Sequence, residues 1–182
     1  MTKHKILIPL DGSKFSQQIL AQVRDFFNPA DHELILLRVA PDPQGLIAMP
    51  PQLISVHWPT PMYQSHRDAE LAQHPIYACQ VWDSQEAMLE YELRADLLYL
   101  RQAGFIVSTA IRFGDPVQEI LNLIIEEKID LIAMTSHGRT GLSQLMFGSV
   151  AEKVLHAAAI PVMILHPKAF QGDASSPDQG KD

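Results

Sequence analysis

Five short apolar runs recur along the chain and alternate with segments of helical periodicity. The runs are Ile6–Pro9, Leu34–Leu37 (ending near Val39), Phe105–Ile111, Leu131–Met134 and Val162–Leu165. Runs of this length, bounded by polar or turn residues, are typical of strands that are buried on both faces. Strands that alternate with helices are joined by right-handed crossovers, which favour a parallel sheet with helices on both faces. We therefore predict an α/β fold built on an open, parallel five-stranded sheet.

Four helices are expected, and their starts carry recognisable capping residues. They begin at Ser13, at Ser84, at Asp115 with Pro116 in the first helical position, and at Val150. The first ends at Asn28–Pro29, the second at Gly104 and the fourth at about Ala158. The apolar positions expected to face the sheet are Phe15, Ile19, Val23, Phe26 and Phe27 in the first helix, Met88, Tyr91, Ala95 and Leu98 in the second, and Val117, Ile120, Leu121, Ile124 and Ile125 in the third.

The segment from about 41 to 81 interrupts this alternation. Prolines at 41, 43, 50, 51, 59, 61 and 75 oppose a long regular helix, whereas its many apolar residues do not suit a simple linker. We interpret it as an insertion that packs on the domain. Because it follows the second strand directly, it starts at the carboxyl edge of the sheet, where it could act as a lid or partner surface or as a passive packed loop.

Composition narrows the class of protein. The 182 residues suit one domain, expected over 1–170, followed by a tail at 171–182 that lacks large apolar residues and is expected to be disordered. A net charge of -7 argues against nonspecific nucleic-acid binding. Neither a membrane-spanning run nor a signal-peptide core is evident, which predicts no membrane partner and a cytoplasmic location. The single cysteine, Cys79, is interpreted as incidental, and the histidines lack the spacing of a metal site.

The stretch from Thr135 to Glu152 contains the strongest chemical signal. It joins the end of an apolar strand to a glycine turn, and Ser149 with Glu152 three residues later matches a capping box, which places a helix start directly after Gly148. The free N–H groups and the positive dipole end of a helix start attract phosphate, and glycine allows close approach to the backbone. The alternative is an ordinary loop before a capped helix.

These residues resemble the nucleotide signature of the universal stress protein family (UspA-type, ATP-binding-motif subgroup), G-x2-G-x9-G-[ST]. Gly138, nine further residues and Gly148–Ser149 match its second half, whereas Thr135 stands at the first glycine. Three further segments resemble the family: Lys5–Ser13 its first strand and following aspartate, Phe113–Pro116 the turn before its third helix, and Ile160–Leu165 its closing strand. The resemblance covers roughly residues 3–40 and 84–167.

The resemblance implies a Rossmann-like, HUP-type three-layer sandwich with strand order 3-2-1-4-5, and a site for ATP or another adenine nucleotide, with which Mg²⁺ can bind. It implies that Asp11 accepts a hydrogen bond from the ribose or the adenine edge, and that Pro9, Leu10 and Val39 form the adenine pocket. Phosphate would lie against the main chain of Gly138 and Gly148. The remaining candidates at this end of the site are Thr135, His137, Arg139, Ser149 and Val150.

The resemblance also implies a homodimer that pairs through Val162–Leu165, and an unidentified protein partner could bind the insertion. No P-loop, dinucleotide fingerprint, carboxylate pair or activated nucleophile is evident, so we expect no catalytic residues and no dedicated enzyme. The leading hypothesis is a regulatory protein of the stress response that binds an adenine nucleotide. A nucleotide-independent interaction module of the same fold is the second hypothesis, and a slow ATPase is the third.

Overall fold

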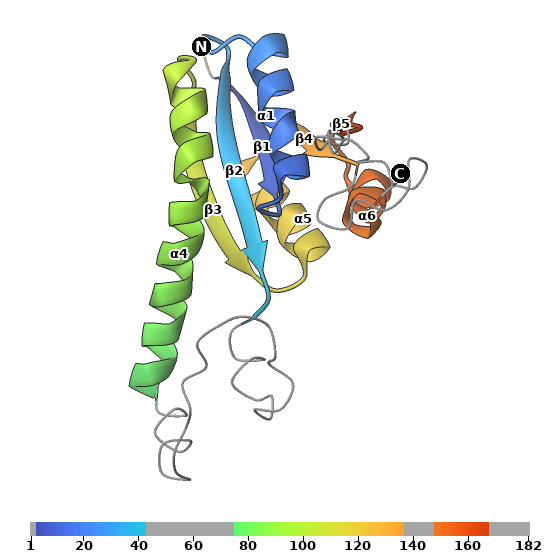
Figure 1. Cartoon of the computed structure of the whole chain (residues 1–182). Coiled ribbons are helices and arrows are strands. Elements are labelled where there is room, and N and C mark those ends of the chain that lie inside the picture. The colour runs from blue at the N-terminus through green and yellow to red at the C-terminus, as the bar shows by residue number, and fades with distance from the viewer. Residues whose placement is uncertain (1–2, 43–74, 137–147, 168–182) are drawn as a thin grey trace, which may run out of the picture.

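The computed structural model describes residues 3–42, 75–136 and 148–167, and Figure 1 shows their arrangement. The elements in chain order are β1 (His4–Leu10), α1 (Lys14–Phe26), β2 (His32–Ala40), α4 (Pro75–Gln102), β3 (Ile106–Phe113), α5 (Pro116–Glu127), β4 (Leu131–Thr135), α6 (Ser149–Ala157) and β5 (Val162–Leu165). The five strands are parallel and form one sheet in the order β3-β2-β1-β4-β5. The predicted fold class and strand order are confirmed.

Helices cover both faces of this sheet and make it the middle of three layers (Figure 1). Successive strand residues point to opposite faces, so each strand supplies two cores. Leu34 and Leu36 of β2 join the core beneath α1 and α4, whereas Ile35 and Leu37 join the core beneath α5 and α6. Strands buried on both faces need the near-continuous apolar runs that are seen in the sequence.

The helix α4 departs most from the sequence-based expectation. It begins at Pro75 rather than Ser84, so the last part of the expected insertion is helical. Proline lacks an N–H group that the first helical turn would leave unpaired in any case, and its fixed φ suits that position, so Pro75 starts the helix rather than preventing one. Figure 1 shows that the first turns of α4 extend beyond the carboxyl ends of β2 and β3.

The expected sheet-facing side of α4 was also wrong. Met88, Tyr91, Ala95 and Leu98 are exposed, and the buried positions are Leu89, Leu93 and Leu100. Two smaller errors have the same cause: Phe26 of α1 and Ile125 of α5 are exposed, while Leu123 of α5 is buried. Each helix has apolar residues on more than one side, and the packing onto the sheet decides which side is covered.

The ends of the elements follow local chemistry in most places. Ser13 caps α1 through Ser16 N–H, and Asp115 caps α5 through Gln118 N–H with Pro116 next in the chain, as expected. The strands β1, β2 and β4 are longer than the expected apolar runs, and β3 begins and ends later than expected. The bounds of β5 are as expected. Residues 43–74 of the insertion and the tail at 171–182 lie outside the described residues. Among the described residues, no helix is both long enough and apolar enough to cross a membrane.

Candidate functional site

A pocket of about 250 Å³ lies at the carboxyl ends of β1, β2 and β4. This is the topological switch point of the sheet, because the chain proceeds from β1 to one side and returns through β4 on the other. Eight candidate residues line the pocket: Pro9, Leu10, Asp11, Val39, Thr135, Gly148, Ser149 and Val150. The other three candidates, His137, Gly138 and Arg139, lie outside the described residues.

The turn after β1 forms one wall of the pocket. Asp11 Oδ1 accepts a hydrogen bond from Ser13 N–H at 2.9 Å, and Ser13 Oγ accepts one from Ser16 N–H at 3.1 Å. Gly12 between them has φ +80°, a left-handed conformation that side chains disfavour. The bond from Ser13 fixes the Asp11 carboxylate in the wall of the pocket, and a carboxylate is a group that can accept several hydrogen bonds.

The opposite wall is the junction of β4 with α6, and here the expected cap was wrong. Gly148, not Ser149, is the N-cap of α6, and no side chain among the described residues caps this helix. Gly148 N–H donates to the buried Ser136 carbonyl at 2.6 Å, so it is not directed at a ligand as expected. Gly148 has φ -65°, and its carbonyl accepts from Glu152 N–H at 3.0 Å.

This arrangement leaves a helix start that faces the pocket. The N–H groups of Ser149, Val150 and Ala151 in the first turn of α6 have no intrahelical acceptor, because the helical ladder begins at Glu152. All three residues line the pocket. In contrast to α6, α1 and α5 begin with side-chain caps. The uncapped start of α6 can therefore hold an anion through main-chain N–H groups and the helix dipole.

The pocket has mainly apolar side walls, and sequence reasoning missed most of them. The lining residues that were not predicted are Ser16, Leu37, Pro116, Ile120, Met134, Ser136 and Ala151. Pro116 and Ile120 come from the start of α5, which lies at the same edge as the ends of the strands. The Asp115–Pro116 helix start was visible in the sequence, and it could have placed Pro116 at the site because helices that follow parallel strands begin at this edge.

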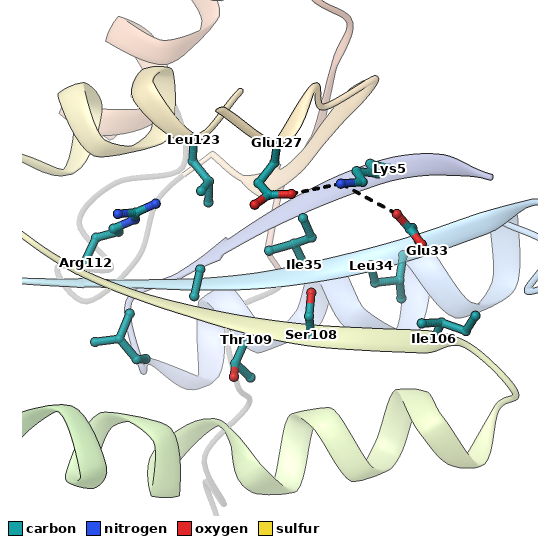
Figure 2. A pocket seen from close by; sticks show the side chains of 12 residues that line it. Lys5, Glu33, Leu34, Ile35, Ile106, Ser108, Thr109, Arg112, Leu123 and Glu127 are labelled. Atoms are coloured by element: carbon teal, nitrogen blue, oxygen red, sulfur yellow. Dashed lines mark hydrogen bonds and ion pairs between the residues drawn. The ribbon is translucent and has the colours of Figure 1, made fainter. Parts of the chain in front are cut away.

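A larger hollow of about 450 Å³ lies elsewhere, over the β2 and β3 surface beside α5 (Figure 2). Lys5 and Arg112 are its two cations, and the Lys5 ammonium lies 2.8 Å from Glu127 and 3.9 Å from Glu33. The hydrogen bond to Glu127 raises the pKa of Lys5, and the same bond lowers the pKa of Glu127. Both cations of this hollow are paired with carboxylates, Lys5 as above and Arg112 with Glu126, and none of its described lining residues belongs to the first turn of a helix. It therefore suits an anion less well than the pocket at the carboxyl edge.

Metal ligands are not clustered in the parts of the chain that the structure describes, where no three His, Cys, Asp or Glu side chains converge. The polar groups that line the pocket are the Asp11 carboxylate, the main-chain N–H groups at the start of α6 and the side chains of Ser16, Thr135, Ser136 and Ser149.

The family model of the universal stress proteins matches residues 3–166. The chain belongs to the universal stress protein family. Among curated relatives, this universal stress protein is 27% identical to universal stress protein MJ0531 of Methanocaldococcus jannaschii over 88% of its own length and 81% of the relative. It is 38% identical to universal stress protein MJ0577 of the same organism over 69 residues, and that match spans only 43% of the relative.

Solved structures share the fold along almost the whole chain. The structure of MJ0577 has a TM-score of 0.68 at 25% identity and covers 93% of this universal stress protein and 99% of MJ0577. Three relatives with lower identity were solved with adenine nucleotides. They are a universal stress protein in complex with cAMP (20% identity, TM-score 0.55), an Arabidopsis thaliana protein with AMP bound (16%, 0.56) and an Archaeoglobus fulgidus protein in complex with dAMP (14%, 0.54).

Proposed function

We propose that this universal stress protein binds an adenine nucleotide, ATP in the cell, in the pocket at the carboxyl edge of the sheet. The observation that carries the proposal is the uncapped start of α6 facing the same pocket as Asp11. A helix start suits phosphate and a carboxylate suits hydroxyl or amine donors, so together they match the two ends of a nucleotide. The relatives solved with cAMP, AMP and dAMP support the choice of adenine.

The pocket supplies a partner for each part of the ligand. Asp11 accepts from the ribose or the adenine edge, and Val39 recognises the exocyclic amine through its main chain. Leu37, Ile120 and Met134 provide apolar walls for the base. The first turn of α6 receives the phosphate nearest the ribose, while Mg²⁺ can accompany the outer phosphates of ATP. The part of the pocket lined by the described residues has a volume of about 250 Å³, which is slightly below the roughly 300–1,000 Å³ of typical small-molecule sites.

We further propose that the nucleotide regulates the protein rather than being turned over. Among the lining residues of the described pocket, Asp11 is the only carboxylate, and no His, Lys or Cys accompanies it as a base or nucleophile. On this proposal the bound nucleotide controls a dimer or partner surface during the stress response, in the cytoplasm.

One observation favours the rival, a nucleotide-independent interaction module. Thr135 stands where the family signature has its first glycine, and its side chain is buried at the end of β4 beside the pocket. A threonine there takes space that glycine leaves open for a ligand. The two functions differ in whether the purified protein carries or binds nucleotide.

The deciding experiment is mass spectrometry of the small molecules released when the purified protein is denatured, followed by calorimetric titration of the ligand-free protein with ATP, AMP and GTP. We expect an adenine nucleotide at up to one per chain, and tighter binding of ATP than of GTP. Absence of released nucleotide together with no heat of binding for ATP or AMP would favour the interaction module.

Asp11→Asn tests the assigned contact more sharply. Asparagine retains a side-chain oxygen for Ser13 N–H and tolerates this turn, so the wall should keep its shape. Because hydrogen bonds to a charged acceptor are roughly twice as strong as neutral ones, we expect about a tenfold loss of ATP affinity. Titration of the folded variant measures this loss, and unchanged affinity would remove Asp11 from the site.

A further inference from the structure

Arg38 is a buried cation in an otherwise apolar layer. It occupies β2 in register with Leu10 of β1, and only 6% of its surface is exposed. Leu34 and Leu36, which share its side of the strand, are core residues beneath α1 and α4. Arginine is rarely buried without partners, and an apolar residue of similar size is often at least as stable in such a place. A buried arginine here therefore suggests a role beyond core packing.

The contacts of Arg38 converge on the turn that carries Asp11. One guanidinium nitrogen, Nη1, donates to the Leu10 carbonyl at 3.3 Å, and Nη2 lies 3.4 Å from Glu92 Oε2 on α4. The guanidinium also lies directly against Gly12, since a Cβ added there would be 2.8 Å from Nη2 and 3.1 Å from Cζ of Arg38. Arg38 thus contacts the residues on both sides of Asp11.

The turn from Leu10 to Ser13 lies between the pocket and the guanidinium of Arg38. Leu10 and Asp11 line the pocket, and the turn contacts the guanidinium of Arg38 through the Leu10 carbonyl and Gly12. Gly12 has φ +80°, and the absence of a side chain there lets the turn lie this close to the guanidinium. Glu92 extends the connection to α4, whose first turns belong to the last part of the expected insertion.

We propose that Arg38 is a positioning residue for adenosine recognition. It holds the Leu10–Ser13 turn so that the Asp11 carboxylate meets the ligand, and its pairing with Glu92 fixes that turn relative to α4. The inference rests on the proposed nucleotide function and adds a specific residue to it. Arg38 lies on the opposite face of the sheet from the core beneath α5 and α6. No contact between Arg38 and the ligand is required.

The test is a double-mutant cycle between Arg38→Met and Asp11→Asn, read by calorimetric titration with ATP. Methionine keeps much of the length and apolar stem of arginine but none of its donors. We expect Arg38→Met to weaken ATP binding about tenfold in the parent and less than about threefold in the Asp11→Asn background. The second loss is smaller because both substitutions weaken the same contact between Asp11 and the ligand. Arg38→Lys should recover part of the affinity, since lysine can donate to only some of these partners.

Arg24→Met is the matched control. Arg24 also pairs with a carboxylate, Asp25, but it lies exposed in the last turn of α1, and its loss should leave ATP affinity unchanged. Hydrogen exchange without nucleotide supplies a second readout: the Gly12 and Ser13 amides should exchange faster in Arg38→Met than in Arg24→Met. If Arg38→Met does not fold, Glu92→Gln carries the same two readouts, with a smaller loss of affinity of about two- to threefold.

The outcomes separate this inference from the proposed function. If the parent protein binds no adenine nucleotide, both are overturned. If the parent binds ATP but Arg38→Met binds equally well, or loses the same affinity whether or not Asp11 is intact, only the positioning role is overturned.

Discussion

Asp96 shows how one half-buried charge affects the stability of the fold. It lies on α4, and its Oδ2 accepts a hydrogen bond from Gln17 Nε2 of α1 at 3.2 Å. Burial raises the pKa of Asp96, and the bond from Gln17 lowers it in part. The net change in pKa is upward, so the folded state disfavours the charged form relative to the unfolded state, in which the pKa of Asp is about 3.9.

The sign of the resulting pH dependence follows from proton linkage. Between the unfolded and the raised folded pKa, the native protein holds a proton that the unfolded chain has released, so this site loses stability as pH rises through that window. We expect Asp96→Asn, which keeps an acceptor for Gln17, to raise the free energy of unfolding at pH 7 and to lose this advantage below about pH 4. Urea denaturation at several pH values measures the free energy of unfolding, and the control is Glu90→Gln at an exposed position of the same helix. A variant no more stable than the parent at pH 7 would contradict the expectation.

Some residues at the candidate site could be predicted from the sequence, and others could not. Asp11 and Gly148 belong to local patterns, a turn after a strand and a glycine before a helix, and both were placed at the carboxyl edge. Arg38 was not singled out, because a polar residue after Leu34–Leu37 looks like the end of a strand. Only the register with Leu10 and the approach of Glu92 from α4 show that it is buried at the turn. Long-range contacts of this kind leave no local signal.

Helices and strands show the same difference between features that depend on local sequence and features that depend on long-range contacts. Strand existence followed from the apolar runs, but β1 and β2 extend to polar residues such as His4, Lys5 and Glu33 because ladder hydrogen bonds form through the backbone whatever the side chain. The Asp115 cap was predictable because its partner is three residues away. The cap of α6 was not, since Gly148 is fixed there by the distant Ser136 carbonyl.

For α4 the periodic pattern allowed two answers. Apolar residues at 88, 91, 95 and 98 and those at 89, 93, 97 and 100 both have helical spacing, so periodicity alone could not select the buried side. The structure buries Leu93 to 2% exposure and leaves Tyr91 73% exposed. Packing against the sheet, not propensity, decided between them.

Paired substitutions on α4 test this assignment. We expect Leu93→Ala to lower the free energy of unfolding by about 2–5 kcal/mol, because it removes buried methyl groups and leaves a cavity. Tyr91→Ala should change it by no more than about 0.5 kcal/mol, as for other exposed positions. Urea denaturation of both variants provides the comparison. The reverse order of effects would mean that the helix packs through the side originally expected from sequence.

At the scale of the molecule, the sheet has two edges, β3 and β5, and the second is where we predict that two chains meet. In the described chain β5 pairs only with β4. The Pro161 and Leu165 carbonyls accept from Ile132 and Ser136 N–H groups, so the odd positions of β5 face β4. In a parallel ladder the even positions, Val162 and Ile164, then direct their backbone groups outward. An unpaired edge of this kind can pair with the same strand of a second copy.

Ile164→Pro is therefore the substitution that tests the homodimer. It removes an outward N–H group from the edge, whereas proline at Met163 would break the internal ladder to β4 and confuse loss of pairing with loss of folding. We expect the parent to have twice the mass of one chain in light scattering, Ile164→Pro to have the mass of one chain, and Ile164→Val, which keeps the donor, to remain dimeric. Circular dichroism checks that each variant is folded. A dimer that persists in folded Ile164→Pro would place the interface elsewhere, and a monomeric parent would show that the β5 edge does not bring two copies together.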